Sequence, residues 1–413
     1  MAIFNRRGAT DAGPASKPGG PAGGAGAADN DTDSVIKEKK PFAQRKPANT
    51  AFKQQRLKAW QPILTPRSVL PTFFVLGLIF APIGAVLYYF SSTVSELTID
   101  YTECISLPLN EDQAIPSSKY SYQLHDISSS NFQQPRWTRT GENACQVFFW
   151  IPTDLDPPLF LYYKLTNYYQ NHRRYVKSLD TQQLLGEVRT ADDLQGGQCK
   201  PVGKDDATGK AIYPCGLIAN SVFNDTFGDP ILLTSSTSQN VTYAMSERGI
   251  VWPGEKDKYK RTTMDPSQLI PPPYWRGATG ERYGKPSGEY FANGSNLFDP
   301  SQDEHFMVWM RTAGLPTFRK LYKRNDADVL RAGYYRLDIT DNYPVTMFKG
   351  TKSIVISTVS WVGGRNPFLG IAYIVVAGLL ILLGLVFTAN HLVRPRRLGD
   401  MSLLSWNAEE GGR

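Results

Sequence analysis

Residues 68–90 read SVLPTFFVLGLIFAPIGAVLYYF, and residues 367–392 read PFLGIAYIVVAGLLILLGLVFTANHL. Neither stretch contains Asp, Glu, Lys or Arg, and each is long enough for the roughly 20 helical residues that cross a bilayer core. The first stretch ends on the aromatic residues 88–90, as expected at a membrane interface. The two stretches therefore predict two transmembrane helices. The alternative, a buried helix of a soluble protein, fits neither their length nor their lack of charge.

The charges that flank the first stretch predict its orientation. Nine lysine and arginine residues lie between positions 37 and 67 against a single acid, whereas the acids Glu96, Asp100 and Glu103 follow the stretch. Basic loops stay on the cytosolic side, so the N-terminus is predicted to be cytosolic. Arginines at 394, 396 and 397 predict the same for the C-terminus. The net charge of +7 thus reflects membrane topology and indicates no nucleic-acid partner.

This topology divides the chain into six parts. Residues 1–50 are rich in Gly, Ala and Pro, and we expect them to form a disordered cytosolic tail. Residues 51–67 form a cytosolic juxtamembrane segment, and residues 393–413 form a second cytosolic tail. Residues 91–366, between the two spans, are expected to face the lumen or the exterior.

Cysteine usage agrees with this placement, because all four cysteines lie between the spans: Cys104, Cys145, Cys199 and Cys215. An even set in an oxidising compartment predicts two disulfides. Sequential pairing closes the shortest of the three possible sets of loops, with chain-entropy contributions of roughly 4 and 3 kcal/mol. A zinc site is not indicated, since the chain has no Cys-x-x-Cys pair.

Three glycosylation sequons also fall between the spans, at Asn224, Asn240 and Asn293. A fourth, at Asn30, lies in the cytosolic tail and is expected to stay unmodified. Charge, cysteines and sequons therefore predict the same topology from independent features of the sequence.

The segment between the spans is predicted to be an antiparallel β-sandwich with long loops, because β-branched and aromatic residues form short runs punctuated by Pro and Gly. We expect the last two strands to pair as a hairpin through Asp341-Asn-Tyr-Pro. The expected strands are 94–102, 146–152, 160–165, 334–338 and 353–362. The expected helices are 179–185 and 318–323.

Two features predict contact with a membrane partner. Bulky and basic or polar side chains alternate in the juxtamembrane segment, where the candidate contact residues are Phe52, Lys53, Gln54, Arg56 and Trp60. Attraction to anionic lipid head groups is the alternative there. Small residues recur in both spans and allow close helix approach, with the candidate contacts Gly77, Ala81, Ala85, Gly370, Ala377 and Gly384. The alternative is that these two stripes pack on each other.

Catalytic motifs are scarce. The four histidines form no His-Glu-x-x-His motif, and the chain has no Gly-x-Ser-x-Gly elbow and no phosphate-binding loop. Asp154 and Asp156 could act as an acid–base pair, but the prolines that follow favour a solvated turn. The basic run at 171–177, NHRRYVK, could bind anionic lipid heads, and a solvated or internally paired strand end is the simpler interpretation.

Several long segments carry a family resemblance: FKQQRLKAWQPILTP, FFWIPTDLDPPLFLYYKLTNYYQNHRRYVKS, PCGLIANSVFNDT, WMRTAGLPTFRKLY and SIVISTVSWVGGRNPFLGIAY. Through them the chain, from about residue 51 to residue 397, resembles the cell-division-cycle-50 family, also called the ligand-effect-modulator family. Members of this family are the β-subunits of type IV P-type ATPases, which are lipid flippases.

The resemblance implies a non-catalytic accessory subunit that forms a heterodimer with the ATPase. It implies roles in assembly, in exit from the endoplasmic reticulum and in activity of an ATPase that moves aminophospholipids to the cytosolic leaflet. We expect an integral membrane protein of the secretory pathway (endoplasmic reticulum, Golgi, endosomes or plasma membrane), with N-linked glycans and no cofactor. The alternatives are a membrane-anchored lumenal enzyme and a stand-alone cargo or adhesion receptor.

Overall fold

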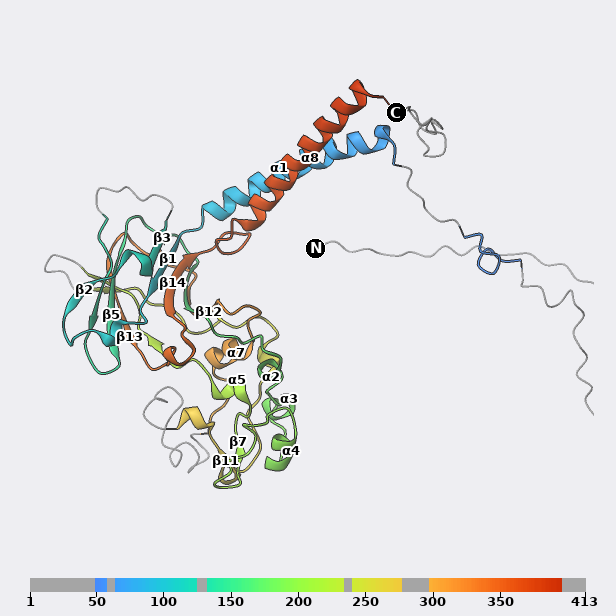
Figure 1. The fold of residues 1–413 in the computed structure, drawn as a ribbon. Coiled ribbons are helices and arrows are strands. Elements are labelled where there is room, and N and C mark those ends of the chain that lie inside the picture. Colours follow the sequence, from blue (N-terminus) through green and yellow to red (C-terminus); the bar gives the residue numbers. More distant parts are fainter. Residues whose placement is uncertain (1–48, 58–63, 125–131, 234–239, 277–296, 396–413) are drawn as a thin grey trace, which may run out of the picture. The chain divides into compact units, whose positions relative to one another are not determined.

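The computed structural model describes residues 49–57, 64–124, 132–233, 240–276 and 297–395 (Figure 1). The chain divides into two compact units, residues 1–63 and residues 64–413. In the first unit, the described residues 51–55 form a turn, which Arg56 N–H closes by donating to Ala51 O over 2.7 Å.

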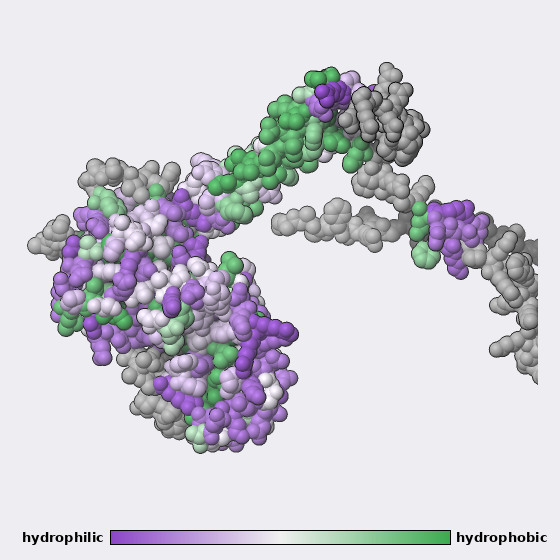
Figure 2. Space-filling view, in the orientation of Figure 1, coloured by the Kyte–Doolittle hydropathy of each residue, from purple (hydrophilic) through white to green (hydrophobic). Residues whose placement is uncertain are grey.

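Both predicted membrane spans are helices in the second unit, α1 (Pro66–Ser92) and α8 (Phe368–Val393). Only 11% of the most apolar part of α1 and 17% of that of α8 is buried, whereas the core helix of a soluble protein would be mostly buried. The surface of the helix pair is accordingly hydrophobic in Figure 2, while hydrophilic residues cover much of the region between the spans. The chain is thus a two-span membrane protein.

Two antiparallel sheets form the part of the region between the spans that adjoins α1 and α8 (Figure 1). In order across the first sheet, the strands are β12 (Phe318–Asn325), β6 (Leu159–Leu165), β14 (Lys352–Thr358), β1 (Glu96–Asp100) and β3 (Tyr120–Gln123). In order across the second, they are β10 (Val241–Thr242), β9 (Ile231–Leu233), β13 (Gly333–Thr340), β5 (Ala144–Ile151), β4 (Arg136–Arg139) and β2 (Asp112–Ala114), and β8 (Thr226–Phe227) also pairs with β13.

Alternating burial shows which face of each sheet is covered. Every second residue of β5 and of β6 is buried, and the buried residues of both sheets belong to one hydrophobic core. Tyr322 of β12 lies edge-on against Phe227 of β8, with ring centroids 4.7 Å apart, which joins the two sheets. Burial of one face of each sheet in a shared core confirms the predicted sandwich.

Short helices and long loops form a second layer of the same unit. The helices are α2 (Arg173–Val176), α3 (Thr181–Leu184), α4 (Ala191–Gly196), α5 (Leu217–Asn220) and α7 (Glu304–Met310), and the small parallel pair is β7 (Ala211–Ile212) with β11 (Leu269–Ile270). Both predicted disulfides are present. Cys104–Cys145 links the turn after β1 to β5, and Cys199–Cys215 closes the loop that contains β7.

A buried ion cluster, which the sequence did not predict, also joins the sheets. Lys352 of β14 is 2% exposed, and its Nζ donates to Asp225 Oδ2 (2.8 Å), Asp341 Oδ1 (2.5 Å) and Tyr343 O (2.7 Å). Asp225 Oδ2 also accepts from Tyr101 Oη at 2.7 Å. Burial, followed by the charge of Asp225, raises the pKa of Asp341 to about 6, against the lowering effect of Lys352. The cluster lies between the end of β13 and the start of β14.

Two secondary-structure predictions were wrong. The expected terminal hairpin does not form, because β13 pairs with β5, β8 and β9 in one sheet while β14 pairs with β1 and β6 in the other. The expected helix 318–323 is strand β12, which pairs with β6 along its length. The last predicted strand, 353–362, ends at Thr358. The other four strands and the helix at 179–185 are present with shifted ends, α3 covering only Thr181–Leu184.

Candidate partner-binding surfaces

The two membrane helices pack tightly on each other in an antiparallel pair. A Cβ added to Gly77 would lie 2.7 Å from Ile381 Cγ1, and one added to Gly84 would lie 2.8 Å from Ile374 Cγ1. On α8, a Cβ at Gly370 would lie 2.7 Å from the backbone nitrogen of Tyr88. Backbone atoms cannot move aside as a flexible side chain can, so the contact at Gly370 needs a glycine.

The predicted small-residue stripes are therefore largely used within the chain. Gly370, Ala377 and Gly384 are all buried in α8, and Gly77 is buried in α1. Ala85 is exposed and Ala81 half-buried; the buried positions of α1 are residues 77, 84 and 91. The alternative that the two stripes pack on each other describes the observed contact. A membrane partner would meet the outer face of the pair, where Gly378 has open space beside it.

Hydrogen bonds join the helix pair to the β-sandwich. Arg365 Nη1, three residues before α8, donates to Val94 O (3.0 Å) and Gln123 O (3.3 Å). Asn366 N–H donates to Ser91 Oγ over 2.9 Å. These contacts connect both helices to the first sheet, so displacement of one element would strain the others. Neither arginine–carbonyl contact was foreseen, because nothing in the sequence brings residue 365 to residue 94.

The exposed juxtamembrane candidates belong to the first unit and are described by themselves. Phe52 is 76% exposed, and residues 53, 54 and 56 are exposed too. Lys53 N–H donates to Thr50 Oγ1 over 3.2 Å, within the same turn. Trp60 lies outside the described residues. An exposed Phe next to exposed bases fits both predicted interpretations, a partner contact and a lipid-facing segment.

A cationic hollow surrounds α2. Its lining is His172, Arg173, Arg174, Lys177, Gly197, Gln198 and Lys200, and its volume is about 540 Å³. Within the described residues, Arg173, Arg174 and Lys177 form no ion pair. The run was interpreted as a strand end, but residues 173–176 form a helical turn. An unneutralised basic surface of this kind fits an acidic partner.

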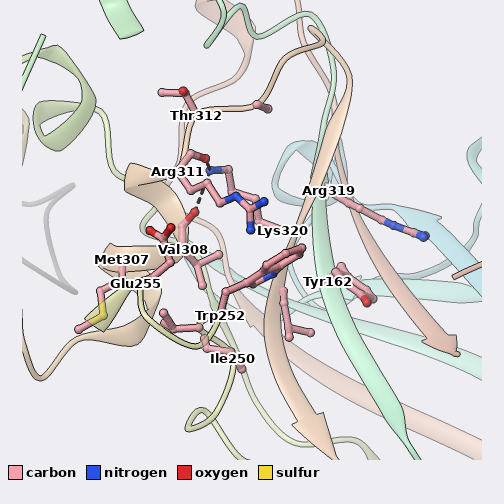
Figure 3. A pocket seen from close by; sticks show the side chains of 13 residues that line it. Tyr162, Ile250, Trp252, Glu255, Met307, Val308, Arg311, Thr312, Arg319 and Lys320 are labelled. Atoms are coloured by element: carbon pink, nitrogen blue, oxygen red, sulfur yellow. Dashed lines mark hydrogen bonds between the residues drawn. The ribbon is translucent and has the colours of Figure 1, made fainter. Parts of the chain in front are cut away.

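A second cavity has a volume of about 490 Å³ (Figure 3). The paired strands β6 and β12 form one side of it, and the end of α7 and the loop at 250–255 form the others. The Arg311 guanidinium lies 4.0 Å from the ring centroid of Trp252, and Arg319 points away from both. Lys320 Nζ donates to the carbonyls of residues 308, 309 and 311 over 2.9, 2.8 and 2.5 Å. Burial, with Arg311 as a smaller cause, lowers the pKa of Lys320 to about 7.

One further contact fixes the loop of this cavity. Glu304 is 4% exposed and accepts from Ile250 N–H (2.9 Å) and Lys256 Nζ (2.7 Å). Trp252, which follows, remains 65% exposed. Trp and Arg are among the residue types enriched at the energetically important centres of protein interfaces. Nothing in the sequence distinguished these two from other surface residues.

One member of the candidate acid–base pair, Asp154, is already bonded to neighbouring groups. Asp154 Oδ2 accepts from Arg331 Nη1 over 2.9 Å, and Oδ1 accepts from Ala332 N–H over 2.7 Å. These bonds lower the pKa of Asp154, the opposite of what a general acid needs at neutral pH. The described residues contain no group of three or more His, Cys, Asp or Glu side chains that could hold a metal ion.

The predicted glycosylation sites differ in exposure. Asn240 is exposed, whereas the side chain of Asn224 is 8% exposed and lines a cavity. Asn293 lies outside the described residues.

Comparison with known proteins identifies the family. Residues 87–397 match the model of the LEM3 (ligand-effect modulator 3) family / CDC50 family. The phospholipid-transporting ATPase accessory subunit CDC50 of Chaetomium thermophilum is 39% identical over 88% of this chain and 92% of its own length. The phospholipid-transporting ATPase accessory subunit CRF1 of Saccharomyces cerevisiae is 40% identical over 88% of this chain and 89% of its length. Cell cycle control protein 50A of Mus musculus is 39% identical over 95% of this chain and 96% of its own length. The chain therefore belongs to the LEM3/CDC50 family.

Proposed function

We propose that this chain is the accessory subunit of a phospholipid-transporting P-type ATPase, with which it forms a heterodimer. The observation that carries the proposal is the similarity of 88% of the chain to two fungal relatives that bear the name of such a subunit, at 39% and 40% identity. The fold supports it, because two spans that pack on each other leave no polar pathway of their own for a lipid head group.

The chain acts without chemistry of its own. Asp154 and Asp156 were the strongest catalytic candidates, and Asp154 is committed to Arg331 and the Ala332 backbone. The ATPase supplies the phosphorylated residue, and this chain contributes assembly, exit from the endoplasmic reticulum and support of the transport cycle that moves aminophospholipids inward. It needs no cofactor.

The region between the spans lies in the lumen or outside the cell, with both termini cytosolic. Charge asymmetry around α1, two disulfides and the sequons support this placement. Resident membranes are those of the secretory pathway, including the endoplasmic reticulum, Golgi, endosomes and plasma membrane, and the sequons carry N-linked glycans.

Four surfaces meet the ATPase. The outer face of the helix pair, around Gly378, packs on its membrane domain. The Trp252–Arg311 pair and the basic hollow around α2 meet its exoplasmic loops. The juxtamembrane residues 52–60 contact its cytosolic side. Binding on both sides of the bilayer favours one conformer of the ATPase by the difference in affinity between conformers.

A transport assay tests this function. The chain is expressed in cells that lack their own family members, together with a phospholipid-transporting ATPase, and inward movement of fluorescent aminophospholipid is measured. We expect uptake, and transfer of the ATPase out of the endoplasmic reticulum, only when both chains are present. An ATPase that leaves the endoplasmic reticulum and transports equally well without this chain would contradict the proposal.

A matched pair of variants tests the membrane contact. Gly378→Leu adds bulk to the outer face, where a Cβ meets nothing, whereas Gly196→Leu adds it to an open position between the spans. We expect the first to lower the yield of complex and the second to leave it unchanged. Equal yields of complex from the two variants would show that the outer face around Gly378 does not contact the ATPase.

A further inference from the structure

A cavity of about 490 Å³ opens on the surface near α5, and its walls are mostly apolar, with several aromatic side chains. The rim contains two exposed apolar residues, Tyr274 at 62% and Met347 at 68%. The other aromatic lining residues are Tyr168, Tyr175, Trp275, Tyr343 and Phe348, and the amide and hydroxyl side chains of the lining are Asn220, Ser221, Asn224 and Asn342. Its described lining contains no charged side chain. Such a site suits a neutral ligand with both apolar faces and hydroxyl groups.

One residue that lines this cavity, Asn224, belongs to a glycosylation sequon. Asn224 is followed by Asp225 and Thr226, the acceptor pattern for an N-linked glycan. Its side chain is 8% exposed, in contrast with the exposed Asn240. A glycan on Asn224 therefore starts at a residue that lines the cavity, beside its aromatic side chains.

The backbone on either side of Asn224 is held in place. Asp225 is fully buried and bonds Lys352 Nζ and the backbone N–H groups of residues 342 and 343, each of the latter at 2.6 Å. Asn342 Nδ2 donates to Asn224 O over 3.4 Å. Because these bonds fix the loop, Asn224 cannot swing its glycan away from the cavity without breaking the ion cluster.

Attachment to Asn224 favours a sugar over a free ligand as the occupant of the cavity. A sugar attached to the wall is present at a high effective concentration, whereas a free ligand must bind from dilute solution. Sugar rings present an apolar face that packs on aromatic rings and hydroxyl groups that bond to amides. We propose that the first N-acetylglucosamine residues of the Asn224 glycan occupy this cavity and cover its apolar walls.

The proposal rests on the lumenal or exterior placement of this region. Measuring which sequons carry a glycan tests the placement and the cavity proposal separately. Full-length protein from a glycosylating eukaryotic host is digested, and occupancy of each sequon is measured by mass spectrometry. Glycans on Asn240 but not on Asn224 would overturn the cavity proposal and leave the topology standing. Bare asparagines at every sequon would overturn both.

Enzymatic release tests the seating of the glycan. The native protein in detergent is treated with peptide-N-glycosidase, and release is followed at Asn224 and Asn240. We expect release at Asn224 to be slower by about tenfold or more, since the enzyme must wait for local opening, and the difference to vanish after denaturation. Equal native rates at the two sites would overturn the proposal.

A pair of variants links this protection to the cavity. Tyr274→Ala removes part of the rim and should speed release at Asn224 several-fold without changing release at Asn240. Val188→Ala, which shortens an exposed apolar side chain of a different cavity, should change neither rate. Undiminished protection in Tyr274→Ala, with the wild-type melting temperature, would show that the cavity walls do not hold the sugar.

Discussion

Replacing Lys352 with Met should destabilise the sandwich severely. The change keeps most of the side-chain volume, but it removes the cation that Asp225 and Asp341 share in a site where Lys352 itself is 2% exposed. Breaking a buried ion pair by removing one partner costs about 3–5 kcal/mol, because the remaining charge stays buried without compensation. At about 2–4 °C per kcal/mol for a large domain, the melting temperature should fall by roughly 10 °C.

The measurement is thermal unfolding of the full-length protein in detergent, followed by tryptophan fluorescence. Lys164→Met is the matched control, because Lys164 lies opposite Ser353 on the neighbouring strand, is half-buried and forms no ion pair among the described residues. Adding Asp341→Asn to Lys352→Met should restore part of the stability, since one buried carboxylate is then neutral. A Lys352→Met protein as stable as the Lys164→Met control would refute the reasoning.

Three further predictions follow from the described contacts. The first concerns pH, because the pKa of Asp341 is raised to about 6. As the pH rises from about 4 to about 6, the wild-type protein should lose up to ~3 kcal/mol of stability relative to Asp341→Asn, measured by urea unfolding. A difference in stability that does not change with pH would contradict the raised pKa. Gly370→Leu should separate the helix pair and lower the yield of folded protein, whereas Gly378→Leu should fold normally, as judged by size-exclusion chromatography; equal yields would mean that the pair does not need close approach at Gly370. Replacing Cys104 and Cys145 with Ser should lower the free energy of unfolding by about 4 kcal/mol, whereas a loss below 1 kcal/mol would show that the disulfide contributes little.

Local patterns in the sequence predicted what depends on composition along the chain. Lack of charge over residues 68–90 and 367–392 identified both spans, and burial that alternates along β5 and β6 matches the strands expected there. Sequential cysteine pairing followed from loop length. In each case the determining interaction is with lipid, solvent or a nearby segment.

Predictions that needed distant contacts failed. The terminal hairpin was expected because β13 and β14 are neighbours in sequence, but their partners β5 and β6 come from near residue 150. The segment 318–323 lacks a clear period, and pairing with β6 determines that it is a strand. The Lys352 cluster joins residues 101, 225, 341 and 352, which no local pattern relates.

The helix stripes show how a small difference in repeat changes a surface. Residues four apart turn by about 400°, so each step drifts by about 40°, whereas residues seven apart drift by only about 20° in the opposite sense. Gly77 and Ala85 therefore point in different directions, and Gly77 with Gly84 shares one face. The same seven-residue repeat on α8 allows the two helices to stay in contact along their length.

Co-purification with the ATPase tests the central claim most directly. The chain is tagged, extracted from native membranes in mild detergent and separated on a native gel, and the chains that migrate with it are identified and quantified. The account predicts a phospholipid-transporting P-type ATPase in a 1:1 complex. A chain recovered alone, or with partners that include no ATPase, would contradict it.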